Sequence, residues 1–422
     1  MNMTQTFAIF LLTAVATAGA QAVPDLTGGS GLPVRGELHY SLRYSQAVSL
    51  YGNNALDEGN QDSSIASANL DYIHAEGRLP FQLHYGGGYM WSISGPSLGS
   101  GVFQSLSVSQ GLVQGRWKAL VSDSVSYTPE APLAGVSGIP GSGDPIGSPG
   151  TNPSSSQSIL TLNTRTLSNS ANVDLGYQLT SSTTLDLGGA SQLLRYPDGN
   201  GLDTDGQRGS VGITRRIDPL NSISGMYTFS RFSFGASPYT ADGAPGAFET
   251  NSVSVDYSRS WSRNLRTDLS VGPQWISGSD SALAPATTTA MVNAVATCEF
   301  RPESVFVNYN RGISGGAGYL PGGTFDSVTG GLSRKFGREL TIGVTGTYSR
   351  TAALESAGGG SDARFGEAQA SRRLGQHFNF FASYTAIDQS SGLQSQTNIL
   401  NQFYQVLSFG VGYASGESHL RQ

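Results

Sequence analysis

Few residues of this chain have the types and spacing that catalysis or metal binding requires. The segment Gly312–Gly316 matches the G-x-S-x-G pattern of a serine nucleophile elbow. That elbow needs a helix directly after it, and the glycine-rich sequence that follows cannot start one. Cys298 is the single cysteine, which excludes a disulfide framework. The histidines show no spacing typical of a metal site; they are His39, His74, His84, His377 and His419. The sequence therefore predicts no enzyme, no cofactor and no metal centre.

Polar and apolar side chains instead alternate along most of the chain. In Leu340–Arg350, the apolar residues Leu340, Ile342, Val344 and Tyr348 alternate with threonine and serine. A period of two is that of a β-strand with one apolar and one polar face. When it recurs along a whole chain, it is typical of a transmembrane β-barrel that is apolar towards lipid and polar towards water.

The N-terminus and the composition agree with this interpretation. An apolar run at residues 7–20 leads to Ala20-Gln21-Ala22, a small-x-small cleavage site, although no Lys or Arg precedes the run. Charged residues make up only 13% of the chain, against about 25% in soluble domains. Lipid-facing positions exclude charge, so a barrel explains this shortage. The net charge of −6 gives no indication of nucleic-acid binding.

Turn signals divide the chain into strands. Eight short connections rich in Pro, Gly, Asn, Asp and Ser alternate strictly with nine longer polar connections. They join about eighteen strands, an even number that suits antiparallel closure with both termini on the side of the short turns. Sixteen strands are the alternative, because the serine-rich pair at 102–127 has the weakest pattern. Pro273 falls within a predicted strand, where it cannot donate to the ladder and so predicts a bulge or a strand end.

The end of the pattern carries a family resemblance. The strand Gln405–Ala414 has Leu407, Phe409 and Tyr413 on one face, and it resembles the last strand of bacterial outer-membrane β-barrel proteins. In that family the assembly machinery reads an aromatic residue at the end of the final strand. The resemblance is architectural and implies a porin-like barrel that contacts outer-membrane lipid and the barrel-assembly machinery. The polar tail Ser415–Gln422 departs from the family pattern.

We therefore expect an all-β protein, a transmembrane antiparallel up-and-down β-barrel in the outer membrane of a Gram-negative-type bacterium. The predicted organisation is a signal peptide at 1–22, a short periplasmic segment at 23–34, the barrel at 35–415 and a polar tail at 416–422.

The polar parity predicts a hydrated lumen lining of mixed charge. Neighbouring Arg and Asp side chains in such a lining are more often structural ion pairs than solute ligands, and His39 and His84 are interpreted as further polar lining. The candidate lining residues are Asp71, Asp174, Arg208, Arg216, Asp256, Arg266, Asp268, Asn308, Glu367 and Arg373.

Tyr and Trp gather towards the predicted strand ends, as in interfacial aromatic girdles. Ordinary cross-strand aromatic pairing is the alternative. Tyr44, Trp91, Tyr196 and Tyr413 are among these residues.

The longest connection, Thr128–Ser158, follows the fifth predicted strand and consists mainly of Pro, Gly and Ser. In porins the loop after the fifth strand folds into the lumen, and this resemblance makes Glu130 and Asp144 candidate constriction residues. The low-complexity composition favours a flexible outer loop.

The predicted function is a channel for small polar solutes, because an 18-stranded barrel is wide enough for an aqueous lumen. The alternative is a non-catalytic barrel that serves an export assembly, such as one for polysaccharide, or that acts as a surface interaction protein.

Overall fold

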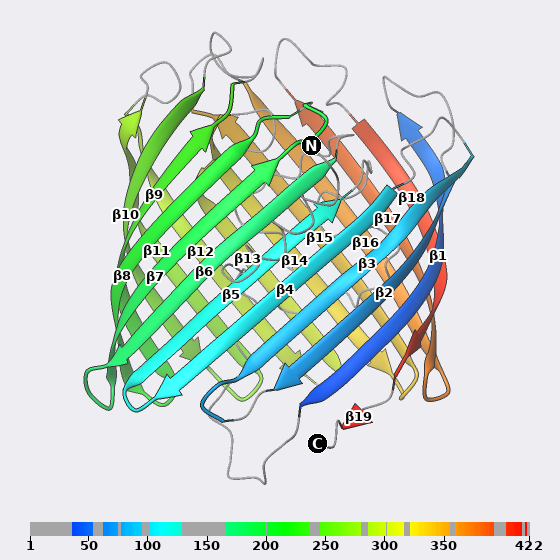
Figure 1. The fold of residues 1–422 in the computed structure, drawn as a ribbon, viewed down its shortest axis with the longest axis horizontal. Helices are drawn as coiled ribbons and strands as arrows, with labels where there is room; N and C mark the ends of the chain where they lie inside the picture. Colours follow the sequence, from blue (N-terminus) through cyan, green and yellow to red (C-terminus); the bar gives the residue numbers. More distant parts are fainter. Residues whose placement is uncertain are drawn as a thin grey trace, which may run out of the picture.

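The computed structural model shows a closed antiparallel β-barrel (Figure 1). Its described residues are 36–53, 62–74, 77–94, 101–128, 165–199, 201–236, 245–279, 286–300, 302–315, 321–354, 359–391, 402–415 and 418–419. Each strand pairs with the strands before and after it in sequence, and β1 pairs with β18 to close the ring. No helix among these residues is long and apolar enough to cross a membrane.

The wall consists of eighteen long strands. They are β1 (Glu37–Asn53), β2 (Asp62–His74), β3 (Phe81–Ser94), β4 (Gly101–Gln114), β5 (Trp117–Thr128), β6 (Thr166–Gln178), β7 (Thr183–Arg195), β8 (Thr204–Asp218), β9 (Asn221–Phe234), β10 (Gly246–Ser260), β11 (Leu265–Ser279), β12 (Thr288–Phe300), β13 (Glu303–Ser314), β14 (Gly323–Phe336), β15 (Leu340–Ala353), β16 (Gly360–Leu374), β17 (Phe378–Ser391) and β18 (Gln402–Ala414). The prediction of eighteen strands is confirmed. The sixteen-strand alternative is wrong, because the serine-rich pair forms two full strands, β4 and β5.

The short connections lie at one end of the barrel, together with the start of β1 and the end of β18 (lower end in Figure 1). We call this the turn end, and the opposite end the loop end. Gly115, Gly337 and Gly375 have φ values of 60°, 65° and 79° in three of these turns. Glycine adopts this left-handed backbone conformation without the steric cost that a Cβ atom brings. The turn chemistry of the sequence therefore fixes where the strands reverse.

The two faces of the wall differ as the alternation requires. Val344 in β15 is 51% exposed on the outside of the barrel, whereas Ser408 in β18 is 1% exposed on the inside. The directly following Phe409 is 38% exposed and points outward again. A closed antiparallel barrel with an apolar exterior is the architecture of transmembrane β-barrels of outer membranes.

Pro273 produces neither the bulge nor the strand end that its position predicts. It lies within β11 and is opposite Ala290 in the ladder with β12. The ladder with β10 lacks the pairs at Gly272 and Pro273 and then resumes in the same register. The missing donor is therefore accommodated by a local gap in pairing, and the bulge of this strand pair lies at Glu249 instead.

The seam between β1 and β18 continues past the last aromatic residue. Ser418–His419 forms a two-residue strand, β19, which pairs with Glu37–Leu38 at the start of β1. Two residues of the predicted polar tail thus extend the seam at the turn end.

Most of the aromatic residues expected in girdles lie on the outer face, where Tyr44 and Tyr89 both contact Trp91 with ring centroids about 6 Å apart. Tyr196 is an exception, because it is only 8% exposed and lies after β7, in the connection to β8. Its backbone N–H donates to the Asp203 carboxylate at 2.9 Å. Burial, and then the Asp203 charge, raise the pKa of the Tyr196 phenol above its ordinary value. Tyr196 therefore belongs to a packed connection and to no girdle.

A buried apolar cluster lies inside the barrel near the loop end. Register places Phe248 of β10 opposite Phe232 of β9 on the inner face, with ring centroids 5.1 Å apart. The buried members of this inner cluster are Leu202, Phe234, Phe248, Ile276, Ile313 and Leu354. They come from β9, β10, β11 and β13 and from the connections before β8 and after β15.

Candidate functional site

The strand registers define one continuous inner face, and its polar residues form the candidate site. Across the first four strands, His39 lies opposite Asp71, Asp71 opposite His84, and His84 opposite Ser107. Side chains at directly opposite positions share one face of the sheet. This row therefore lies on the inner wall near the turn end.

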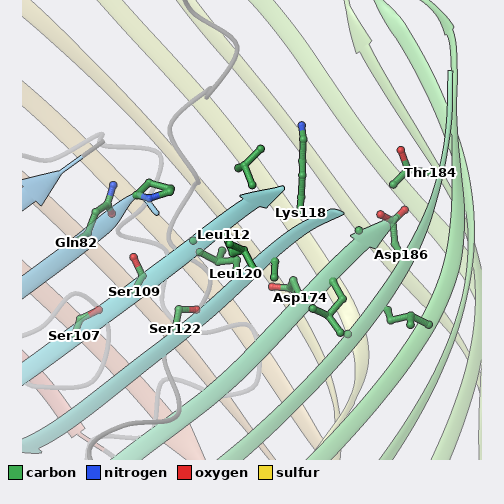
Figure 2. A pocket seen from close by; sticks show the side chains of 18 of the residues that line it. Gln82, Ser107, Ser109, Leu112, Lys118, Leu120, Ser122, Asp174, Thr184 and Asp186 are labelled. Carbon is green, nitrogen blue, oxygen red and sulfur yellow. The ribbon is translucent and has the colours of Figure 1, made fainter. Parts of the chain in front are cut away.

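A recess of about 850 Å³ is hollowed in the inner wall of β2 to β9 (Figure 2). Serine, threonine, glycine, aspartate and one lysine supply most of its polar lining. Figure 2 shows Lys118, Asp174 and Asp186 on three consecutive strands, β5, β6 and β7. The recess therefore combines these polar groups with apolar side chains such as Leu112 and Leu120.

Short polar side chains and glycine give the recess its size. The Thr214 hydroxyl donates to Asp186 Oδ2 at 2.6 Å, which holds this carboxylate against the wall. Position 188, opposite Asp174, is glycine, and a Cβ added there would lie 3.5 Å from Asp174 Oδ1. The Ser210 hydroxyl lies closer still, so a larger side chain at Gly188 would displace Ser210 and reduce the open space.

The remaining residues predicted to line the lumen fall on the same face. On β10 and β11, Asp256 accepts a hydrogen bond from Ser224 at 3.2 Å, and Arg266 pairs with Asp268 at 3.1 Å. Asn310 donates to Asn308 at 3.0 Å.

The predicted lining residues of β8 and β16 also lie on this face. On β8, Arg216 donates to the Ser181 carbonyl of a turn at 3.2 Å, while Arg208 lies opposite Ala190 and Ser230. On β16, Glu367 lies opposite Thr345 and Thr385, and Arg373 opposite Asn379.

These charges form two layers along the barrel. Five basic residues of the inner face lie within two residues of the turn ends of their strands, whereas Arg43 and Arg208 lie farther from that end; the five are Lys118, Arg216, Arg266, Lys335 and Arg373. Aspartates lie three or four residues from the turn ends; they are Asp71, Asp174, Asp186, Asp256 and Asp268. A solute passing along this wall meets mainly basic side chains and then aspartates, and the carboxylates of Glu37 and Glu299 lie at the level of the basic residues.

Sequence reasoning did not single out Asp186, Lys118 or Arg43 as lining residues. The signal for Asp186 was present, because it stands between Leu185 and Leu187, both on the outer face of β7. Lys118 and Arg43 also occupy positions of β5 and β1 whose side chains face inward.

The motifs with possible chemistry remain structural. Cys298 lies in β12 opposite Leu265 and Val305 and is partly exposed. Ser314 ends β13 as a 4% exposed residue, and the preceding Ile313 N–H donates to Gln274 Oε1 at 2.9 Å. Within the described ranges no group of three His, Cys, Asp or Glu side chains is arranged to hold a metal ion. Glu130 and Asp144, the predicted constriction residues, lie outside the described residues.

Comparisons with known proteins find similar barrels among solved structures. Pseudomonas aeruginosa OpdL is 11% identical, with a TM-score of 0.43, and the alignment covers 90% of this chain and 98% of that chain. Pseudomonas aeruginosa OccK2 (OpdF) is 12% identical, with a TM-score of 0.46 and coverage of 90% and 97%. A BenF-like porin from Pseudomonas fluorescens Pf-5 is 9% identical, with a TM-score of 0.46 and coverage of 90% and 98%. No protein-family model and no curated protein matches the chain. These similarities assign no function, which is argued from the barrel wall itself.

Proposed function

We propose that this chain is an outer-membrane channel that passes small polar solutes. The observation that carries the proposal is the contrast between the two faces of the closed wall. Large apolar side chains such as Val344 are half exposed outside, whereas small polar residues such as Ser122 and Ser408 supply much of the inner wall, which also holds a recess of about 850 Å³. Small residues do not fill the interior of an 18-stranded barrel, which therefore holds water.

The same proposal sets the orientation and the surroundings of the barrel. Residues 1–22 act as a signal peptide, the turn end faces the periplasm and the loop end faces the cell exterior. The apolar outer face contacts lipid, and the barrel-assembly machinery inserts the chain.

Conductance in planar lipid bilayers tests the function. The purified, refolded protein should give stable openings with weak ion selectivity, because the basic and acidic layers oppose one another. A barrel with heat-modifiable gel migration but without conductance would refute the channel. Circular dichroism in detergent gives the matching control for folding, since a β-dominated spectrum is required before the absence of current is meaningful.

A non-conducting barrel that serves an export assembly or presents its loops to a partner is the second candidate. One observation favours it: the inner cluster around Phe248 occupies part of the barrel interior near the loop end. A barrel that conducts neither with nor without residues Gly135–Pro153 would support this second candidate, and in a conducting barrel the same deletion tests the position of the loop. If the 128–158 connection with Glu130 and Asp144 narrows the lumen, the deletion raises the conductance. If that connection is an outer loop, the deletion leaves the conductance unchanged.

A further inference from the structure

Two imidazoles and two carboxylates are adjacent on the inner face of β1, β2 and β3. The His84 Nδ1 atom shares a hydrogen bond with the Asp71 carboxylate. His39 lies opposite Asp71 on the other side, and its Nε2 atom is 3.6 Å from Glu37 Oε2. We call Glu37, His39, Asp71 and His84 the histidine row.

The histidine row is accessible to water. The side chains of His84 and Asp71 are both 40% exposed, and those of His39 and Glu37 are 32% and 35% exposed. Asp71 and His84 also line the recess of the inner wall. Protons and small ions in the lumen therefore reach these side chains directly.

From this geometry we infer that the histidine row makes the ion preference of the pore depend on pH. The inference rests on the proposed channel function. An ordinary histidine changes its charge between about pH 5 and pH 8. With both imidazoles neutral, Glu37 and Asp71 contribute two negative charges to the wall. With both imidazoles protonated, these charges are balanced.

Few other charges lie on the inner face of β1 to β4, and Lys118, Asp174 and Asp186 line the same recess farther along the wall. On β1, Arg43 is the next charged residue of the inner face and keeps one positive charge throughout. The facing position on β4 is Ser107, and Gly412 is the β18 residue opposite Arg43. His419 of β19 lies opposite Glu37 in the ladder and is tested separately below. With Arg43 included, the net charge of this part of the wall changes from −1 to +1 on protonation.

The size of the effect follows from screening. Two unit charges that act on a permeating ion over about one Debye length, about 10 Å at 0.1 M salt, change the ratio of cation to anion permeability about two- to threefold. The sign is fixed, because a wall that gains positive charge attracts cations less and anions more. Acidification should therefore lower the preference for cations.

Reversal potentials of the reconstituted full chain in a KCl gradient measure this ratio. In wild type, the ratio of K⁺ to Cl⁻ permeability should fall about two- to threefold between about pH 7.5 and about pH 5.5. The double variant His39→Gln/His84→Gln should keep an almost constant ratio, and each single variant should lose about half of the change. His74→Gln is the matched control, because His74 lies on β2 with the outward parity and should leave the change intact.

Several results would overturn the inference. An unchanged ratio in the conducting wild type would do so, as would a full pH response in the double variant. A response that disappears in His419→Gln and persists in the double variant would assign the effect to β19. A protein that inserts but does not conduct at either pH refutes the proposed channel itself, so failure of the function and failure of the inference give different results.

Discussion

Replacing Val344 by lysine should destabilise the barrel, whereas the same substitution at the next residue should be tolerated. Val344 is the fifth residue of β15 and is 51% exposed on the outer face. Four steps of about 3.4 Å along a strand tilted by about 40° place it about 10 Å above the turn end. The apolar band of such barrels is about 25 Å tall, which puts Val344 close to its centre. A lysine there should cost about 2–4 kcal/mol.

Thr345 provides the matched control in the same strand. It lies on the inner face, opposite Glu367 of β16 and Gly331 of β14. A lysine at this position extends into water beside a carboxylate and has a glycine on its other side. We expect the free energy of unfolding to change by less than about 1 kcal/mol, since exposed ion pairs contribute little.

The assay is reversible urea unfolding in lipid vesicles, followed by tryptophan fluorescence and by heat-modifiable gel migration. Val344→Lys should lower the unfolding midpoint strongly, and Thr345→Lys should have a midpoint close to that of wild type. Equal losses in the two variants would show that the two faces of the wall are in similar environments. The assignment of the outer face to lipid would then be wrong.

Three further substitutions test separate parts of the wall. Phe248→Ala empties the centre of the inner cluster, where Phe248 is 1% exposed, and should lower the free energy of unfolding by about 3–5 kcal/mol in the same urea titration. Gly272→Ala places a methyl group against the Val253 carbonyl, and overpacking of this kind costs about 1–3 kcal/mol of unfolding free energy. An unfolding midpoint equal to that of wild type would contradict the close approach of the Val253 carbonyl to Gly272. Arg364→Ala removes an ion pair with Asp388 in which the two side chains are 72% and 49% exposed; the expected change is below about 1 kcal/mol, and a larger loss would mean that the pair is shielded from water.

The number of strands and the orientation of their polar and apolar faces were predictable from the sequence. The two-residue alternation of polar and apolar side chains resumes after every turn. A hairpin fixes which residues are opposite one another, so the parity of one strand carries over to the next. Ser408 stands between Leu407 and Phe409, Thr345 follows Val344, and both polar residues lie on the inner face. The turn residues, such as Gly337 with its positive φ, marked the reversals equally clearly.

Pairing across strands and the contents of the interior were not predictable from parity alone. Arg364 contacts Asp388 at 3.2 Å because of a register that the sequence does not state. In Phe229–Phe234, phenylalanine occupies both parities: Phe229 lies on the outer face, and Phe232 and Phe234 lie on the inner face. Hydrophobicity cannot distinguish a lipid contact from packing inside the barrel. The inner cluster was missed for this reason.

The gap at Pro273 shows a similar limit. A proline in a strand removes one donor, and several local solutions accommodate that loss equally well. The choice depends on the neighbouring strand, where the Val253 carbonyl approaches Gly272 closely. No pattern within β11 itself contains that information.

At the seam, β1 and β18 pair in the same way as strands that are neighbours in sequence, so the ring of strands has no gap where the chain starts. Its ladder runs from Ser41 opposite Ala414 to Asn53 opposite Phe403. Beyond it, Tyr40 and Ser415 form two hydrogen bonds of 2.9 Å with each other. Both strand ends lie at the turn end, so a short peptide could join them as one more hairpin. A circular permutant opened at Gly337 would then keep every ladder while β15 became the first strand to be synthesised. In such a chain the strands are synthesised in a different order, while each strand keeps its place in the wall. In the natural sequence the order of synthesis and the order around the wall are the same.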